Sequence, residues 1–289
     1  MDSVAVEKYH GTGNDFVIVD ANASDVPDRA AFAATHCDRE TGVGGERTGA
    51  DGVLFLSLDP DARPVSVEMT LVQPDGSVAD MCGNGARCAA AWATERTGRG
   101  ESVVRTPAGD RRAVVRESGA TVEMGRPSFA PADVPLATDG PLVEEAVEGL
   151  TVTAVTTGVP HAVALVDDVD AVALDEVAPP VRHADVFPEG ANVTLAARAD
   201  GGGTGATGEG VAFRQRTYER GVEGETMACG TGAVAVVAVA RRLGLVDAPG
   251  PHRVSPPGGD LLVIVPDDGP ATLTGPVVRE FAADLEVPA

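Results

Sequence analysis

Apolar and polar residues alternate in many short runs along this chain, which is the pattern of β-strands that bury one face. A helix is expected at residues 27–40, because Pro27 suits a first turn and Gly42 lies just beyond the end. Residues 82–96 and the Ala- and Val-rich segment after Cys229 predict two further, buried helices. Strands are expected at residues 4–9, 16–20, 53–58, 65–72, 102–106, 112–116, 121–124, 150–156, 161–166 and 211–220.

Two glycine-rich segments that begin with cysteine occur about half the chain length apart. Cys82-Gly83-Asn84-Gly85-Ala86 matches Cys229-Gly230-Thr231-Gly232-Ala233, and each segment precedes one of the predicted buried helices. A weaker pair, Gly13-Asn14-Asp15-Phe16 and Gly158-Val159-Pro160-His161, has nearly the same separation. Two motifs that recur in the same order at nearly the same spacing indicate a duplicated unit.

The repeat predicts the fold class. We expect an α/β protein of the α+β type with two pseudo-symmetric halves and the active site in the cleft between them. Each half would be a mixed or antiparallel sheet, or a barrel, wrapped around its Ala-rich helix. The N-terminal half is expected at 1–125, completed by a C-terminal strand at 271–289, and the second half at 126–270. Residues 201–210 are glycine-rich and are expected to form a mobile hairpin tip.

A cysteine at the start of a helix has a distinctive environment. The first backbone N–H groups of a helix are unpaired and carry partial positive charge, so a thiolate is favoured relative to its ordinary pKa of about 8.5. The same groups bind a carboxylate, and glycines let it approach closely. Cys82 and Cys229 would hold one sulfur on each face of an amino-acid α-carbon. We predict a racemase or epimerase in which one thiolate removes the α-proton and the other thiol protonates the opposite face, as a coupled pair.

Other interpretations of the cysteines and of the lysine are weaker. Cys37 and Cys88 are expected to be apolar packing residues. The chain has no C-x-x-C pair and no phosphate-loop or dinucleotide motif, so neither a metal nor a nucleotide cofactor is expected. Lys8 is the only lysine and is expected in an edge strand, so a pyridoxal phosphate Schiff base is not expected and Lys8→Arg should retain most activity. We therefore predict an enzyme without cofactors.

The charge and cysteine content of the chain limit the binding partners and the cellular location that we expect. It has 44 acidic against 22 basic residues and a net charge of −22, which disfavours nucleic acid and anionic membranes as partners. A small-molecule amino-acid substrate is the expected partner, with a homodimer left open. No signal peptide or membrane span is evident, and four cysteines without disulfide spacing favour a cytoplasmic location. The single lysine among many carboxylates favours adaptation to a very salty cytoplasm over an ordinary acidic protein.

The motifs of this chain resemble those of the diaminopimelate epimerase family. The matching segments are residues 8–16, 80–88, 158–163, 187–193, 219–232 and 273–277. They occur in the family's order and together span the whole chain.

The resemblance implies inversion of one centre of LL-2,6-diaminopimelate to the meso form, on the route to lysine, by Cys82 and Cys229 without metal or cofactor. It implies that His161 and Glu219 tune the thiols and that Arg220 holds the distal carboxylate as a fork. Without the resemblance, Glu219 and Arg220 would be interpreted as a surface pair, His161 as a packed strand residue and Asn192 as a turn residue. The implied substrate contacts are Asn14, Gln73, Gly83, Asn84, Asn192, Glu219, Arg220, Gly230 and Thr231.

The chain departs from the family pattern at several positions. Asn is usual where this chain has Gln73 and Val159, a side-chain amide is common at the place of Gly52, and one residue is extra within 222–224. These departures reduce the number of expected contacts to the far end of the substrate, so the motifs indicate the reaction type more firmly than the identity of the substrate. One alternative is a related two-thiol racemase for proline or hydroxyproline, although such enzymes lack the Glu-Arg pair. The other is a non-enzymatic thiol sensor that oxidises Cys82 and Cys229 to a disulfide.

Overall fold

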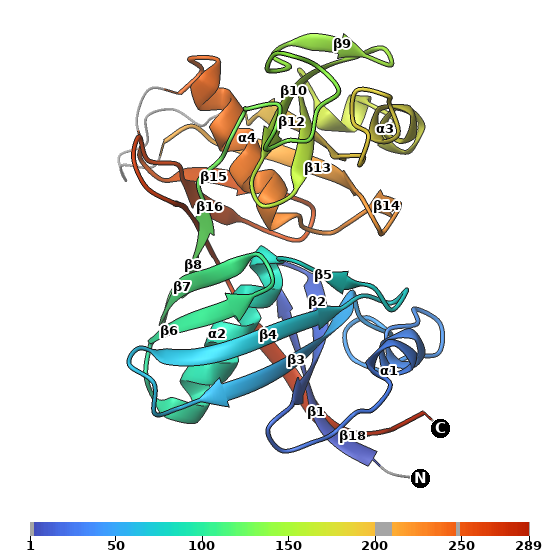
Figure 1. Cartoon of the computed structure of the whole chain (residues 1–289), viewed down its shortest axis with the longest axis vertical. Helices are drawn as coiled ribbons and strands as arrows, with labels where there is room; N and C mark the ends of the chain where they lie inside the picture. Colours follow the sequence, from blue (N-terminus) through green and yellow to red (C-terminus); the bar gives the residue numbers. More distant parts are fainter. Residues whose placement is uncertain (1–2, 200–209, 247–248, 289) are drawn as a thin grey trace. The chain divides into compact units, whose positions relative to one another are not determined.

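The computed structural model describes residues 3–199, 210–246 and 249–288, and the chain divides into two compact units (Figure 1). Unit 1 comprises Met1–Val122 and Gly275–Ala289, and unit 2 comprises Glu123–Thr274. The expected hairpin tip lies outside the described residues except for Gly210. Among the described residues, no helix is long and apolar enough to cross a lipid bilayer.

Unit 1 is a mixed sheet that surrounds one buried helix. Its strands are β1 (Ser3–Gly11), β2 (Asn14–Asp20), β3 (Gly52–Asp59), β4 (Val65–Val72), β5 (Val78–Ala79), β6 (Glu101–Thr106), β7 (Gly109–Arg116), β18 (Val278–Glu286) and the first part of β8 (Gly119–Gly125), which continues into unit 2. Its helices are α1 (Arg29–His36) and α2 (Gly83–Thr97). α2 packs against β1, β3, β4, β6 and β7, and Figure 1 shows it behind the strands of this sheet.

Unit 2 repeats this arrangement. Its strands are β9 (Glu145–Val147), β10 (Leu150–Thr156), β11 (Pro160–Leu165), β12 (Asn192–Arg198), β13 (Phe213–Glu219), β14 (Gly224–Glu225), β15 (His252–Ser255), β16 (Leu261–Ile264) and β17 (Ala271–Gly275). Its helices are the short η1 (Val169–Ala171), α3 (Leu174–Arg182) and α4 (Gly230–Arg242). α4 packs against β10, β11, β12, β13, β15 and β16.

The strand pairings of the two units follow one pattern. In unit 1, β1–β2 is antiparallel, β2–β3 parallel, β3–β4 antiparallel, β4–β6 parallel and β6–β7 antiparallel. In unit 2, β10–β11, β11–β12, β12–β13, β13–β15 and β15–β16 follow the same sequence. The two-residue strands β5 and β14 each pair antiparallel with the strand before them and precede a cysteine. The predicted α/β fold of two pseudo-symmetric halves is thus confirmed.

Small side chains allow strands to pack closely around the central helices. Every residue of α4 from Gly230 to Ala240 is buried, and these residues are Gly, Ala and Val with one Thr. α2 is buried from Gly83 to Ala93, and its only large buried side chains are Arg87 and Trp92. A chain so poor in aromatic residues builds its cores from such aliphatic contacts.

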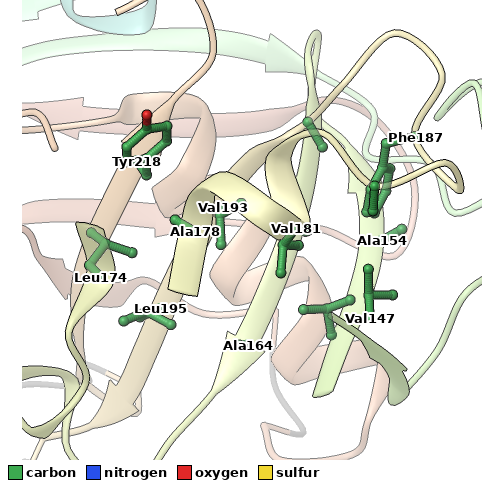
Figure 2. Packing of buried hydrophobic residues seen from close by; sticks show 14 of the residues in the cluster. Val147, Ala154, Ala164, Leu174, Ala178, Val181, Phe187, Val193, Leu195 and Tyr218 are labelled. Atoms are coloured by element: carbon green, nitrogen blue, oxygen red, sulfur yellow. The ribbon is translucent and has the colours of Figure 1, made fainter. Parts of the chain in front are cut away.

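The outer helix of unit 2 was not expected from the sequence. Leu174, Ala178 and Val181 recur at helical spacing and pack on Val193 and Leu195 of β12 (Figure 2). Pro179 and Pro180 lie inside this helix, and each removes a backbone hydrogen bond. Burial of the apolar face outweighs that loss, because packing rather than propensity supplies most helix stability in proteins.

Two details of unit 1 differ from expectation. α1 is shorter than residues 27–40, because Asp28 caps its start and the Asp38 carboxylate accepts the N–H groups of Glu40 and Thr41 in a turn after its end. β1 is not an edge strand, since it pairs with β2 on one side and β18 on the other. The prediction of an edge position for Lys8 was therefore wrong.

Candidate active site

The two cysteines of the repeated motif are the N-caps of the two central helices. Cys82 precedes α2 with extended backbone angles of φ −141° and ψ 116°, and its Sγ accepts the N–H of Gly85 at 3.4 Å. Cys229 precedes α4 with φ −112° and ψ 105°, and its Sγ accepts the N–H of Gly232 at 3.4 Å. Each sulfur occupies the place that a capping oxygen takes in most helices. Cys82 is half-buried and Cys229 is buried.

In unit 1, two asparagines join the Cys82 cap to a buried ionic cluster. The Asn14 Oδ1 accepts Asn84 Nδ2 at 3.1 Å and lies 3.8 Å from the Cys82 Sγ, which donates to it. Asn14 Nδ2 donates to Asp51 Oδ2 at 2.5 Å. Asp51 also pairs with Arg39, and its own pKa is raised by burial and by the neighbouring carboxylate Asp15. Of the predicted site residues, the structure therefore brings Asn14, Cys82 and Asn84 together.

Lys8 belongs to this ionic cluster. Its ammonium lies 3.1 Å from Asp15 Oδ2 and donates to the carbonyl oxygens of Gly44 and Arg47 at 3.2 and 2.5 Å. Burial raises the pKa of Asp15, but the charges and hydrogen bonds of Arg39 and Lys8 bring it below its ordinary value. Lys8 is fully buried, so Lys8→Arg would force a larger cation into an occupied space. A loss of stability is therefore a better expectation for this variant than neutrality.

Arg87 is a functional candidate that was not predicted from the sequence. Its guanidinium is fully buried and donates to Asn84 Oδ1 at 2.8 Å and to Thr12 Oγ1 at 2.7 Å. Its Nε has no hydrogen-bond partner among the described residues, and no carboxylate there pairs with it. Burial lowers the pKa of Arg87 to about 10, and Cys88 and Cys82 oppose that effect. The available signal was an arginine within a segment of small residues predicted to be buried.

In unit 2, His161 is hydrogen-bonded next to the Cys229 cap. Its Nε2 lies 3.0 Å from Thr231 Oγ1, which lies 3.3 Å from Cys229 Sγ, and its Nδ1 lies 3.1 Å from Thr194 Oγ1. Burial lowers the pKa of His161 to about 3, and the charge of Arg220 contributes in the same direction. The imidazole is therefore neutral near pH 7.

A chain of polar side chains orients this imidazole. Gln215 Nε2 donates to the carbonyl of Cys229 at 3.2 Å and to Thr217 Oγ1 at 2.9 Å, and Thr217 Oγ1 lies 3.2 Å from Thr194 Oγ1. Because a carbonyl only accepts, the Gln215 amide has one allowed orientation. Thr217 Oγ1 therefore accepts from Gln215, and Thr194 Oγ1 links Thr217 to His161 Nδ1. Gln215, Thr217 and Thr194 were not predicted from the sequence, although Thr194 is a polar position within the largely apolar strand β12.

The orientation of Asn192 determines the tautomer of His161. Asn192 Oδ1 accepts a backbone N–H, so its Nδ2 faces His161 Nε2 as a donor, at 3.4 Å. Nε2 therefore accepts, and the ring proton resides on Nδ1 and is donated to Thr194 Oγ1. The Cys229 sulfur lies next to the Gly232 amide and the Thr231 hydroxyl.

The predicted distal contacts of unit 2 lie beside His161. Asn192 Oδ1 accepts the backbone N–H of Arg220 at 2.7 Å, and Arg220 Nη1 donates to the carbonyl of Glu189 at 3.1 Å. The Glu219 carboxylate accepts the hydroxyl of Thr226, in the segment that leads to Cys229. The ends of β12 and β13 therefore place these side chains around one helix start.

The positions that depart from the family pattern have local partners. Gln73 lies in the turn before β5, where its Oε1 accepts the Ser77 hydroxyl at 3.2 Å. A Cβ at Gly52 would lie 2.6 Å from a methyl group of Leu71 and 3.0 Å from the carbonyl oxygen of Val72, so a side chain there requires Leu71 to shift. The turn with the extra residue is held by Glu223, which accepts from Gly221 N and Arg182.

One cavity of unit 2 lies apart from the predicted site residues. It has a volume of about 620 Å³ and lies beside α3, lined in part by Leu142, Val147, Pro180 and His183. No group of three or more His, Cys, Asp or Glu side chains in the described ranges could hold a metal ion.

Comparison with known proteins points to one family. The family model for diaminopimelate epimerase matches residues 6–130 and 153–280. A diaminopimelate epimerase of Methanocella arvoryzae is 41% identical over 298 residues, covering 99% of this chain and 98% of the relative. One of Archaeoglobus fulgidus is 38% identical over 293 residues, covering 98% and 97%.

Solved structures of low identity share the fold. A phenazine biosynthesis protein of the PhzF family from Bacillus anthracis superposes with a TM-score of 0.68 at 16% identity, covering 99% of this chain and 100% of the other. A hydroxyproline epimerase from Agrobacterium vitis gives a TM-score of 0.64 at 16% identity, covering 99% and 91%. At such identities the likeness concerns the fold alone.

Proposed function

The chain belongs to the diaminopimelate epimerase family, and on that premise we propose that it inverts one α-carbon of LL-2,6-diaminopimelate to give the meso isomer, a step on the route to lysine. The observation that carries the proposal is the matched pair of cysteine caps, Cys82 on α2 and Cys229 on α4. The reaction is an isomerisation that leaves the composition of the substrate unchanged.

The proposed mechanism uses the two sulfurs as acid and base. The thiolate of one cysteine takes the α-proton and becomes a thiol, leaving the bonding electron pair on the α-carbon and its carboxylate. The thiol of the other cysteine gives its proton to the opposite face and becomes a thiolate. The mechanism requires both capping sulfurs to reach one α-carbon, and it leaves the enzyme in the reverse protonation state, ready for the reverse reaction.

The first turns of the two helices are the proposed cradle of the α-carboxylate. The backbone N–H groups of Gly83 and Asn84, and those of Gly230 and Thr231, belong to first turns, where a helix supplies no acceptor of its own. Negative charge that spreads onto the carboxylate during proton removal is stabilised by these fixed dipoles. Glycine at the first helical position lets the carboxylate approach the backbone.

The far end of the substrate is assigned to the group around Asn192. Arg220 is the proposed partner of the distal carboxylate, as a two-donor fork, and Asn192 and Glu219 supply polar contacts to the distal amino-acid group. Asn14 and Gln73 are the proposed polar contacts from unit 1. We also propose a cytoplasmic location, where the thiols stay reduced.

Proton exchange in heavy water tests the proposal. The pure protein with LL-diaminopimelate and no added cofactor should incorporate one deuterium at the α-carbon as the meso isomer forms. Cys82→Ser and Cys229→Ser should each lower inversion by at least about a thousandfold, because a serine hydroxyl is a far weaker acid and base at neutral pH. Cys37→Ala, which changes a buried thiol whose pKa is raised to about 12 by burial, is the matched control and should remain active.

The same assay separates the alternatives. Turnover of proline or hydroxyproline without turnover of diaminopimelate would establish the related racemase. A protein that turns over none of these substrates and forms a disulfide between Cys82 and Cys229 on oxidation would establish the thiol sensor. Full activity in either serine variant would end the two-base mechanism while leaving the substrate assignment to be decided by the wild-type assay.

A further inference from the structure

A buried cation without a carboxylate partner among the described residues lies beside the Cys82 cap. Arg87 is on α2, and its guanidinium is fully buried. The two side chains that accept its hydrogen bonds, Asn84 and Thr12, are both neutral. Buried arginines are usually paired with an anion, because removing an isolated charge from water is costly. A guanidinium that is buried with only neutral acceptors is available to stabilise negative charge that forms nearby during a reaction.

We propose that Arg87 is the counter-cation of the Cys82 cap: it stabilises the thiolate of Cys82 and the carboxylate that docks on the first turn of α2. The inference rests on the proposed function for the docked carboxylate. The effect of Arg87 on the sulfur is independent of the substrate and can be tested without one.

Arg87 also fixes the orientation of the two asparagines at the cap. A guanidinium only donates, so Asn84 presents Oδ1 to Arg87 and Nδ2 to Asn14. Asn14 therefore presents Oδ1 to Asn84 and Cys82, and Nδ2 to Asp51. The hydrogen bonds run in one direction from the cation Arg87 to the carboxylate of Asp51, which prevents either amide from flipping.

The two influences on Cys82 have opposite signs. Asn14 Oδ1 accepts from the S–H group and stabilises the thiol, whereas the charge of Arg87 stabilises the thiolate. A residue that acts as a base in one direction of the epimerisation and as an acid in the other must be able to populate both protonation states near neutral pH. Among the described residues of unit 1, the charged and titratable groups around this cap include Arg87, Cys88, Asp51, Asp15, Arg39, Arg47 and Lys8.

The pH dependence of alkylation tests this assignment. Iodoacetamide would be reacted with the substrate-free full chain at a series of pH values, and peptide mass spectrometry would give the midpoint for Cys82 and Cys229 separately. In Arg87→Gln, we expect the Cys82 midpoint to rise by about one pH unit or more, as loss of a nearby opposite charge predicts. The Cys229 midpoint should move by less than that of Cys82, because Cys229 feels the change only through its coupling to Cys82. A Cys82 midpoint equal to that of the wild type would overturn the proposal.

Two further variants separate charge from structure. Arg87→Lys keeps the charge and loses the fork, so its Cys82 midpoint should remain within a few tenths of a unit of the wild type. Arg253→Gln removes one exposed arginine from unit 2 and should move neither midpoint. An equal rise in Arg87→Lys and Arg87→Gln would show that only the hydrogen-bond geometry matters, which would also overturn the charge assignment.

A measurement that leaves Arg87 in place covers the case in which Arg87→Gln does not fold. In Cys229→Ser, the thiolate absorbance near neutral pH reports Cys82, because burial raises the pKa of both Cys37 and Cys88 to about 12. The Cys82 midpoint should lie below the ordinary thiol value of about 8.5. A midpoint above that value would overturn the proposal. Deuterium incorporation from diaminopimelate remains a separate test of the function, so either inference can fail alone.

Discussion

At the scale of single residues, burial and the ordinary pKa of the side chain together decide which groups carry charge. His161 and Arg87 are both fully buried, yet His161 is neutral and Arg87 remains a cation near pH 7. Sequence patterns and family resemblance pointed to His161, Cys82 and Cys229. They did not point to Arg87, because its importance follows from the missing carboxylate among the described residues around it, which only the packed structure reveals.

His161 should make stability depend on pH. Its pKa is lowered from 6.5 to about 3 in the folded protein, so between these values the unfolded chain binds a proton that the folded protein does not. The stabilisation is complete above pH 6.5 and is lost as the pH falls toward 3. Urea unfolding at pH 7.5 and pH 5 should show a larger loss for the wild type than for His161→Gln. An equal loss in both proteins would contradict this.

The orientation of Asn192 makes a specific prediction for the imidazole. Nitrogen NMR of protein labelled in histidine should show His161 neutral at pH 5, with its proton on Nδ1. The assignment follows from Asn192, whose Oδ1 accepts the backbone N–H of Arg220 so that its Nδ2 faces Nε2 as a donor. Loss of that preference in Asn192→Leu is expected, since the fixed donor is removed. A proton on Nε2 in the wild type would contradict the assignment.

At the scale of elements, sequence pattern predicted most strands and both central helices. Alternation at period two identified β4 and β10 with the bounds found in the structure, and the Cys-Gly-x-Gly segments located α2 and α4. α3 was missed because Pro179 and Pro180 are strong local signals against a helix, while the opposing signal is packing on β12. Local propensity cannot register a contact between segments far apart in the sequence.

The second glycines of the two helix starts are equivalent in sequence and differ in surroundings. A Cβ at Gly85 would meet a flexible methyl group of Leu54 at 3.2 Å, whereas one at Gly232 would meet Gln215 Nε2 at 2.6 Å and Thr217 Oγ1 at 3.1 Å. Alanine gains about 1 kcal/mol over glycine in a helix. Gly85→Ala should therefore be close to neutral, and Gly232→Ala should lose about 1–3 kcal/mol through overpacking. Urea unfolding of the two variants checks this; equal stabilities would contradict it.

At the scale of the whole molecule, the repeated Cys-Gly-x-Gly motif was sufficient to predict two similar halves from the sequence. The net charge of −22 is likewise a property of the whole molecule, since it is the sum over all charged side chains. Self-repulsion of that size acts on the compact state and is screened by salt.

Stability should therefore rise with salt. Moving from 0.1 M to 1 M potassium chloride shortens the screening length from about 10 Å to about 3 Å, which weakens repulsion among the carboxylates. Scanning calorimetry should show an increase in Tm over this range. Chloride is preferred to sulfate, since sulfate stabilises most proteins through exclusion from their surface. A Tm that is constant or falls would show that repulsion contributes little to the stability of this protein.

The pairing of β18 with β1 has a consequence for synthesis on the ribosome. These strands run antiparallel from the Ser3↔Glu286 pair to the His10↔Val278 pair, and both belong to unit 1. Unit 2 is contiguous in the chain and is translated in full before β18 emerges. During translation, unit 2 can therefore fold before unit 1 is complete. Until β18 has been synthesised, β1 lacks one of its two neighbouring strands and its backbone groups on that side are unpaired.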